Sequence, residues 1–302
     1  GAITMPEFLE GRYCSRTLKI LAATIIFIFL VPYTAAVYMG LSYLFEMTLQ
    51  IKYIHALIFM ATLTGCYLIM GGYYALALTD FVQGLVMLIG VIVMVAALVG
   101  QQGGLIHATH SLMNPEFAPG LKEPGAIPGW LTLLSLVFVT SFGPWGMPQM
   151  VQKFYAIKSR DAIKPATIVV TLFSLIIAFG AYYTGALTHL FYAVPPANLD
   201  NLMPRFLTEF APPWITLLIM LLVLAASMST LSSLVLVSAS AVAVDIYAGN
   251  GKRSDRSTVA LMRLLCACFV IFSCVLALKQ PAVIADLMII AWGTVAGSFL
   301  AP

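Results

Sequence analysis

The nine residues 225 to 233, AASMSTLSS, decide how this chain is interpreted. They lie within a long apolar run, residues 214 to 247, so their hydroxyl groups fall at membrane depth. Two explanations are open for such a cluster. Small and hydroxyl side chains let membrane helices pack closely and hydrogen-bond to a neighbour or to the preceding turn. Alternatively, neutral oxygens can bind a hard cation such as sodium, which needs no sulfur or nitrogen ligand.

Helical geometry groups these side chains. At 3.6 residues per turn, Ser229, Ser232 and Ser233 share one face of a helix, and Ala226 lies one turn earlier on it. Thr230 is about 100° around the helix from Ser229. The pattern therefore allows two adjacent clusters of oxygen atoms.

The composition excludes several classes of protein. The chain has 302 residues, of which 61% are hydrophobic and 9% charged, whereas soluble domains carry about 25% charged residues. This composition predicts an all-α, polytopic membrane helix bundle. The net charge of +3 includes no basic block, so we expect no nucleic-acid partner. No hydrophilic stretch is long enough for a soluble domain of about 50 residues.

Apolar runs recur along the whole chain, so residues 1–302 are expected to form a single transmembrane domain. The sequence looks like an excerpt of a longer protein. Residues 1–16 are expected to form a cytoplasmic interfacial segment, and residues 193–213 an extracellular loop region. A Gly- and Pro-rich loop of about 27 residues is expected after the third span. The eight predicted spans are approximately residues 18–45, 53–70, 76–99, 130–151, 166–192, 214–244, 259–278 and 283–302.

The basic residues indicate an orientation. If the N-terminus of the chain is cytoplasmic, eleven of the fifteen lysines and arginines fall in cytoplasmic segments and four in outside segments. This distribution follows the positive-inside rule. We therefore expect a multi-pass protein of the cell membrane with a cytoplasmic N-terminal segment.

Residues 143 to 148, GPWGMP, interrupt the fourth span. Two prolines and two glycines within six residues cannot continue a regular helix. A simple proline kink is one interpretation. The other is a break that lines a cavity, since non-helical backbone at membrane depth must be buried in protein or face water. Pro32 predicts a kink in the first span.

Asp80 is the only acid within the interior of spans one to six. A carboxylate in a membrane helix costs about 2.5–3.5 kcal/mol on insertion scales, so it usually faces a partner or water. It could be an acid that reaches the cytoplasmic interface, or the charged ligand of a cation whose other oxygens come from the sixth span.

Other candidate residues indicate little chemistry. His107 and His110 form an HxxH pair in the Gly- and Pro-rich loop, but no acid or cysteine is near enough to support zinc. Gly293 and Gly297 suit close helix packing, and Asp245 is expected to cap the sixth span. The chain shows no catalytic triad, paired carboxylates or phosphate loop, so we do not expect an enzyme.

Eight short motifs occur along the chain: TMPEF at 4–8, RY at 12–13, GGY at 71–73, TDFVQ at 79–83, GMPQ at 146–149, KF at 153–154, ASMSTL at 226–231 and DIY at 245–247. Taken together, these motifs resemble those of the sodium/solute symporter family, and they occur in family order along the whole chain. The overall appearance is similar to the branch that carries proline and pantothenate.

The resemblance implies a fold and a function. The family has the five-plus-five inverted repeat of the leucine-transporter fold, and the eight spans match its core helices three to ten. The implied function is sodium-coupled import of a small organic solute such as proline, pantothenate or a related carboxylate. Implied partners are sodium, the solute and the lipid bilayer; no cofactor is implied, and a monomer is expected to suffice. The alternative is a symporter-like sensor domain that binds a solute without moving it.

The resemblance also implies binding residues. The first sodium site would use the Ala226 carbonyl and the Ser229 and Thr230 hydroxyls, with further carbonyls from a first core helix outside this sequence. Some relatives hold a second sodium, and the matching positions here are Asp80, Ser229, Ser232 and Ser233. Candidates for the substrate cavity are Tyr33, Thr140, Gly143, Pro144, Trp145 and Pro148. The run from Thr140 to Trp145 departs from the sugar-transporting branch, which argues against a sugar substrate.

Overall fold

The computed structural model describes residues 4–70, 73–114, 129–155, 157, 159–192, 194, 196–248 and 255–300. These residues form helices, and no strand occurs among them. The α-helices are α1 (Met5–Tyr13), α2 (Arg16–Leu49), α3 (Tyr53–Met70), α4 (Tyr73–Gln101), α5 (Leu105–Met113), α6 (Trp130–Phe142), α7 (Pro148–Tyr155), α8 (Ile163–Leu187), α9 (Leu202–Phe210), α10 (Pro213–Ser240), α11 (Asp255–Lys279) and α12 (Ile284–Phe299). The other elements are the 3-10 turns η2 (Gly143–Gly146), η3 (Arg160–Ala162), η4 (Thr188–Leu190) and η5 (Leu199–Asn201), and the π-helix η6 (Ala241–Ala248).

The predicted spans correspond to helices of the structure. Among the described residues, five helices are long and apolar enough to cross a membrane, and the bent pair of α6–η2 with α7 adds a sixth. The remaining two predicted spans, α3 and α12, are represented by shorter apolar helices. The all-α membrane bundle is therefore confirmed, whereas the count of eight includes two helices that length alone would not select.

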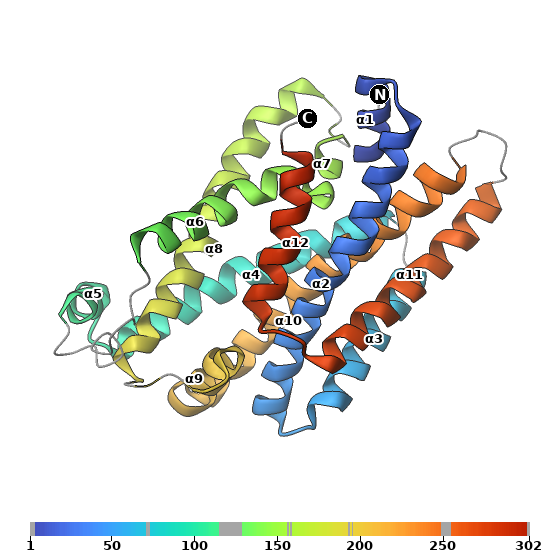
Figure 1. The fold of residues 1–302 in the computed structure, drawn as a ribbon. Coiled ribbons are helices and arrows are strands. Elements are labelled where there is room, and N and C mark those ends of the chain that lie inside the picture. Colours follow the sequence, from blue (N-terminus) through green and yellow to red (C-terminus); the bar gives the residue numbers. More distant parts are fainter. Residues whose placement is uncertain are drawn as a thin grey trace.

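Helix α2 organises the bundle. It packs against α10, α11 and α12, while α4 packs between α10 and α8. Figure 1 shows α2 beside α12, with α3 and α11 on one side and α4, α6 and α8 on the other. Ala22, Ala23, Ile26 and Leu30 form a buried stripe on α2 because they recur at the helical period. Pro32 lies inside α2, which continues past it.

The contact between α4 and α10 is unusually close at one point. A Cβ atom built on Gly90 would lie 2.6 Å from the Leu222 side chain, so only glycine fits there without a shift. Small residues at such crossings let membrane helices approach each other. This crossing places the start of α4 beside the middle of α10, which positions the candidate ion site.

The fourth span is broken as its glycines and prolines predict. Helix α6 ends at Phe142, the turn η2 follows, and α7 leaves at a bend of 48°. Gly146 makes the break fit, since a Cβ atom there would lie 2.9 Å from the Ala296 Cα of α12. The non-helical backbone is thus packed against another helix, where membrane depth can tolerate it.

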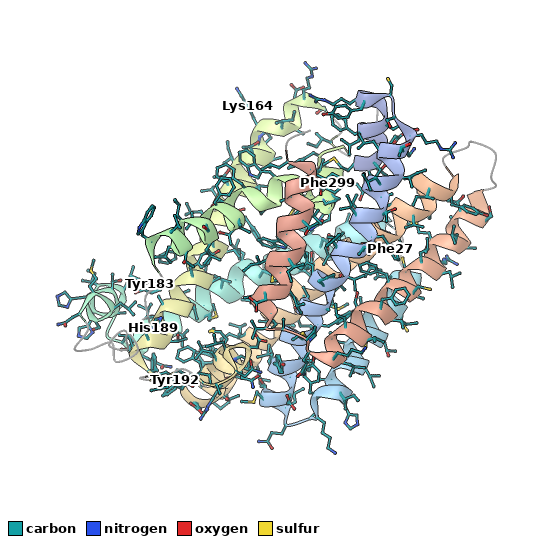
Figure 2. All side chains as sticks on the ribbon, viewed as in Figure 1. Phe27, Lys164, Tyr183, His189, Tyr192 and Phe299 are labelled. Atoms are coloured by element: carbon teal, nitrogen blue, oxygen red, sulfur yellow. The ribbon has the colours of Figure 1, made fainter. Side chains whose placement is uncertain are left out.

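The prediction of a Gly- and Pro-rich loop after the third span is partly wrong. Its first half forms α5, because residues 105–113 contain good helix formers after the positive-φ Gly104. Thr109 of α5 lies 2.9 Å from the Tyr183 hydroxyl of α8, which ties the helix to the bundle (Figure 2). Residues 115–128 of this loop lie outside the described residues.

The region predicted as an extracellular loop, 193–213, also contains a helix. Helix α9 buries Phe206 and Leu207 on one side and leaves polar residues on the other. Phe206 packs edge-to-face on Phe191, and the Tyr192 hydroxyl donates to Glu209 at 2.6 Å (Figure 2). Composition concealed this helix because its apolar face is only a few residues long.

Candidate functional site

The side of α10 that carries Ser229, Thr230, Ser232 and Ser233 is its hydroxyl face. Part of the hydrogen bonding of these hydroxyls is satisfied within the helix. Thr230 Oγ1 donates to the Ala226 carbonyl at 2.9 Å, and Ser232 Oγ donates to the Ser229 carbonyl at 2.9 Å. Such bonds to the preceding turn are what packing alone predicts. They use the hydroxyl protons, and each hydroxyl oxygen keeps lone pairs for another ligand. Ser233 is half-buried on the same face.

Ser229 points to a different partner. Its Oγ donates to Asp80 Oδ1 of α4 at 2.8 Å, which brings together residues 149 positions apart. The Asp80 side chain is 20% exposed, so the carboxylate is neither sealed in the core nor surrounded by water. The structure therefore places the membrane carboxylate of the third span beside the hydroxyl face of the sixth.

Asp80 has a second partner that the sequence did not indicate. Lys153 Nζ of α7 lies 3.3 Å from Asp80 Oδ2. Lys153 appeared in the sequence only as part of a family motif after the broken span. Nothing in its spacing connects it to a residue 73 positions earlier, because the contact depends on how α7 is placed after the bend of 48°.

A cavity of about 580 Å³ opens next to the hydroxyl face. Its wall includes Ala226, Ser227 and Thr230 of α10 and Tyr33 of α2, and Asp200 borders it from η5. The rest of the wall is mainly apolar, with four methionines from α4, α9 and α12. Its volume lies within the range of small-molecule sites, and its few polar groups are typical of them.

Asp200 lies where the connection between α8 and α9 meets the start of α12. Its two carboxylate oxygens each accept from the Ile284 N–H, at 3.2 Å. Burial raises the pKa of Asp200, and this bond from Ile284 partly opposes the rise. Sequence reasoning missed this residue because a lone acid in a polar loop resembles an ordinary turn residue.

Of the residues predicted to line a substrate cavity, Tyr33 faces the large one. Its ring packs edge-to-face on Trp292 of α12, at 5.7 Å between centroids. Gly143 of the broken span lies against the same indole, since a Cβ atom there would lie 3.6 Å from Trp292 Cε3. Trp292 therefore contacts both Tyr33 and the break.

The other predicted cavity residues lie elsewhere in the described structure. Thr140 Oγ1 donates to the Leu136 carbonyl of its own helix at 2.8 Å. Pro144 is half-buried, and Trp145 is 69% exposed, with its ring against Phe142. These residues do not border the large cavity.

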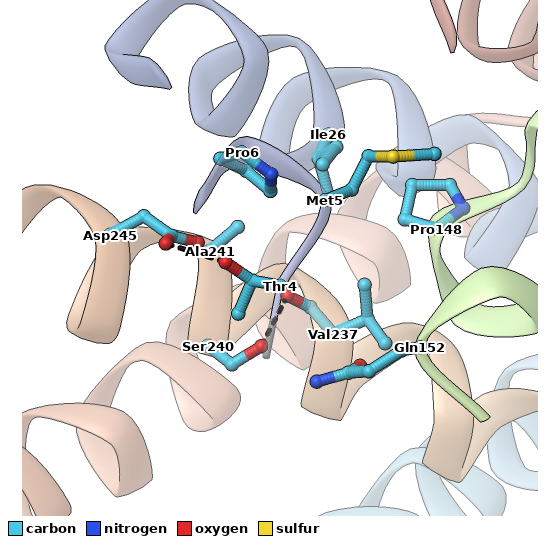
Figure 3. Close-up of a pocket in the computed structure, with 10 residues that line it drawn as sticks. All are labelled: Thr4, Met5, Pro6, Ile26, Pro148, Gln152, Val237, Ser240, Ala241 and Asp245. Atoms are coloured by element: carbon cyan, nitrogen blue, oxygen red, sulfur yellow. Dashed lines mark hydrogen bonds between the residues drawn. The ribbon is translucent and has the colours of Figure 1, made fainter. Parts of the chain in front are cut away.

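Pro148 lines a much smaller pocket at the other end of α10 (Figure 3). Its volume of about 10 Å³ is close to that of one water molecule. Thr4, the N-cap of α1, accepts from the Glu7 N–H at 3.2 Å and donates to Asp245 Oδ1 at 2.7 Å. The N-terminal segment is thereby joined to the π-helical end of the sixth span.

Asp245 is more than the helix cap that the sequence suggested. Its side chain is 1% exposed, and Lys19 Nζ of α2 lies 3.9 Å from its Oδ1. Lys19 is itself fixed by Glu10 of α1, at 2.8 Å. The expected cap is thus a buried link between three segments.

The described residues contain no group of three or more His, Cys, Asp and Glu side chains placed to hold a metal. His107 and His110 are both exposed on α5. The five cysteines are free thiols. The candidate site therefore consists of the Asp80–Ser229 contact, the α10 oxygens and the adjoining cavity.

Comparison with known proteins identifies the family of the chain. The model of the Sodium:solute symporter family matches residues 1–302. The chain is 30% identical to the osmoregulated proline transporter OpuE of Bacillus subtilis, over 99% of the chain and 61% of that protein. It is 28% identical to the sodium/pantothenate symporter of Escherichia coli, over 100% of the chain and 63% of that protein. The chain thus spans less than two thirds of the length of these relatives.

A solved structure has the same fold. It is described as the substrate-bound outward-open state of a Na+-coupled sialic acid symporter, and it superposes with a TM-score of 0.75 at 20% identity. The match covers 98% of this chain and 65% of that one. The family model, the relatives and the fold agree with the family that the motifs resemble. The chain belongs to the sodium:solute symporter family.

Proposed function

We propose that the protein is a sodium-coupled symporter that imports a small organic solute across the cell membrane. The observation that carries this proposal is the contact between Asp80 and Ser229, because it supplies a carboxylate and a hydroxyl at one point between two membrane helices. Oxygen ligands of this kind suit a hard cation. Family membership supports the same activity.

The first sodium site of this proposal uses the Ala226 carbonyl and the hydroxyl oxygens of Ser229 and Thr230. Thr230 already donates its proton to the Ala226 carbonyl, so its oxygen can present lone pairs to the ion. Ala226 and Thr230 also border the large cavity. Sodium bound here would lie beside the solute, which is the arrangement that coupling needs.

The second site of this proposal uses Asp80, Ser229, Ser232 and Ser233. Sodium between Asp80 and this face would neutralise a carboxylate that is costly inside a membrane. It would also hold α4 against α10. Such a link can couple ion and solute only to the extent that sodium prefers the solute-binding conformation.

For the solute, we propose proline, pantothenate or a related carboxylate. The supporting observation is that the two relatives described above are transporters of proline and of pantothenate. The mainly apolar cavity wall suits the hydrocarbon part of such a molecule, and Tyr33, Ser227 and Thr230 offer polar contacts.

Uptake by the full-length protein in liposomes tests the proposal. We expect labelled proline or pantothenate to accumulate with an inward sodium gradient and not with an equal potassium gradient. Ser229→Ala should abolish this sodium dependence. The control is Ser135→Ala on α6, whose hydroxyl bonds only to its own preceding turn in the described contacts. Sodium-dependent binding without accumulation would favour the sensor, and no sodium effect at all would refute the proposal.

A further inference from the structure

The contact between Lys153 and Asp80 has no role in the proposed sodium sites. Each oxygen of the carboxylate has a different partner, since Oδ1 accepts from Ser229 at 2.8 Å and Oδ2 lies 3.3 Å from the Lys153 ammonium. Ser229 lies on α10, Asp80 on α4 and Lys153 on α7. One carboxylate therefore connects three helices.

The ammonium and a sodium ion would compete for this carboxylate. Both carry a single positive charge, and both are attracted to the same oxygen atoms. Two cations held within a few ångströms of each other repel, so the carboxylate favours one of them at a time. Sodium has one geometric advantage, because a small ion between α4 and α10 can contact the carboxylate and the Ser229 oxygen together, whereas the tethered ammonium approaches Asp80 Oδ2 from α7.

Lys153 is placed so that it can leave. Its side chain is 54% exposed and extends on a flexible four-carbon stem, so no close packing holds the ammonium against the carboxylate. Exposed ion pairs contribute little to stability, which makes this partner replaceable. When no ion is bound, the ammonium supplies the charge that a carboxylate at membrane depth requires.

We propose that Lys153 is a tethered cation that occupies Asp80 when sodium is absent and is displaced when sodium binds. This exchange replaces a link between α4 and α7 with a tighter link between α4 and α10. Helix α7 follows the break in the fourth span and also packs against α10 and α1. Ion binding at Asp80 thereby releases the helix next to the break. The inference rests on the proposed function, specifically on sodium binding at Asp80.

Sodium titration of the purified full-length protein, followed by its unfolding temperature, tests the exchange. Lys153→Gln removes the competitor, so the sodium concentration for half-maximal stabilisation should fall about two- to five-fold, as loss of an exposed ion pair predicts. Lys153→Arg keeps a positive charge and should remain near the wild-type value. The control is Lys164→Gln, an exposed lysine in the first turn of α8, which should leave the midpoint unchanged (Figure 2).

A double variant separates competition from a general effect of charge. In an Asp80→Asn background there is no carboxylate to compete for, so Lys153→Gln should no longer change the midpoint. An unchanged or higher midpoint in Lys153→Gln alone, with normal sodium stabilisation of the wild type, would overturn the exchange. Absence of any sodium-specific stabilisation of the wild type would instead refute the proposed function.

Discussion

Asp80 and Asp245 are surrounded by the same kinds of group but differ in their exposure to the surroundings. Each accepts a hydrogen bond from a hydroxyl, at 2.8 Å from Ser229 and at 2.7 Å from Thr4. Each also has a lysine nearby, Lys153 at 3.3 Å and Lys19 at 3.9 Å. The side chains of the first pair are 20% and 54% exposed, whereas those of the second are 1% and 10% exposed.

The comparison indicates that the burial of a carboxylate decides whether it can exchange one cationic partner for another. Around Asp245, the side chains of the acid and of Lys19 are almost closed to bulk solvent, and Lys19 is held in place by Glu10 as well. Around Asp80, water and an exposed ammonium can exchange with an ion. We therefore assign Asp245 to holding the segments together and propose that Asp80 binds and releases cations.

The largest predicted effect is on stability at Asp245. Asp245→Ala should destabilise the protein by about 3 kcal/mol, because it leaves the buried Thr4 hydroxyl without its acceptor and takes one of two carboxylates from a largely buried ammonium. Thermal unfolding in detergent measures this loss. The control is Glu10→Gln, which removes the other, half-exposed partner of Lys19 and should cost much less. Equal effects of the two substitutions would contradict the assignment of Asp245 as the buried anchor.

The next effect is on sodium linkage at Asp80. A ligand bound only by the folded state stabilises it by about 2.7 kcal/mol at a hundred times its dissociation constant. Asp80→Asn should remove most of the sodium-specific stabilisation that the second site contributes, while unfolding in potassium changes little. Parallel melts in sodium and potassium measure the difference. A loss of stability that is equal in both salts would make Asp80 a structural residue like Asp245.

A smaller effect is predicted at Thr4. Thr4→Val removes both the N-cap of α1 and the bond to Asp245, and we expect a loss of about 1–2 kcal/mol. Ser15→Ala is the matched control, since Ser15 caps α2 by accepting from the Leu18 N–H at 3.3 Å. Unfolding temperatures of the two variants give the comparison. If both lose the same stability, the bond to Asp245 contributes nothing measurable.

The smallest effect is predicted at Glu209, on the exposed face of α9. The neighbouring Arg205 and the Tyr192 hydroxyl hold the pKa of Glu209 below its usual value. A lowered pKa stabilises the fold above the usual pKa of the group, and this contribution is lost as pH falls through the lowered value. Because the pair is exposed, Glu209→Gln at neutral pH should leave the unfolding temperature unchanged within error. A clear decrease in the unfolding temperature would show that this ion pair contributes to stability although it is exposed.

Much of the fold could be predicted because it depends on local pattern. Apolar runs long enough for a membrane located the helices, and the glycines and prolines of residues 143–148 marked the break between α6 and α7. Helix α9 escaped prediction, since its buried face is only a few residues wide and interrupts a polar segment. Local periodicity weakens as an element becomes shorter.

The sequence alone determined that Ser229, Ser232 and Ser233 share a helix face, because helical periodicity is a property of consecutive residues. It also determined the family, since the motifs occur in order along the chain. The tertiary structure alone decided that Ser229 meets Asp80, that Lys153 reaches the same carboxylate and that Thr4 joins Asp245 across 241 positions. Such contacts depend on how separate helices cross, and spacing along the chain carries no information about the angle and depth of a crossing.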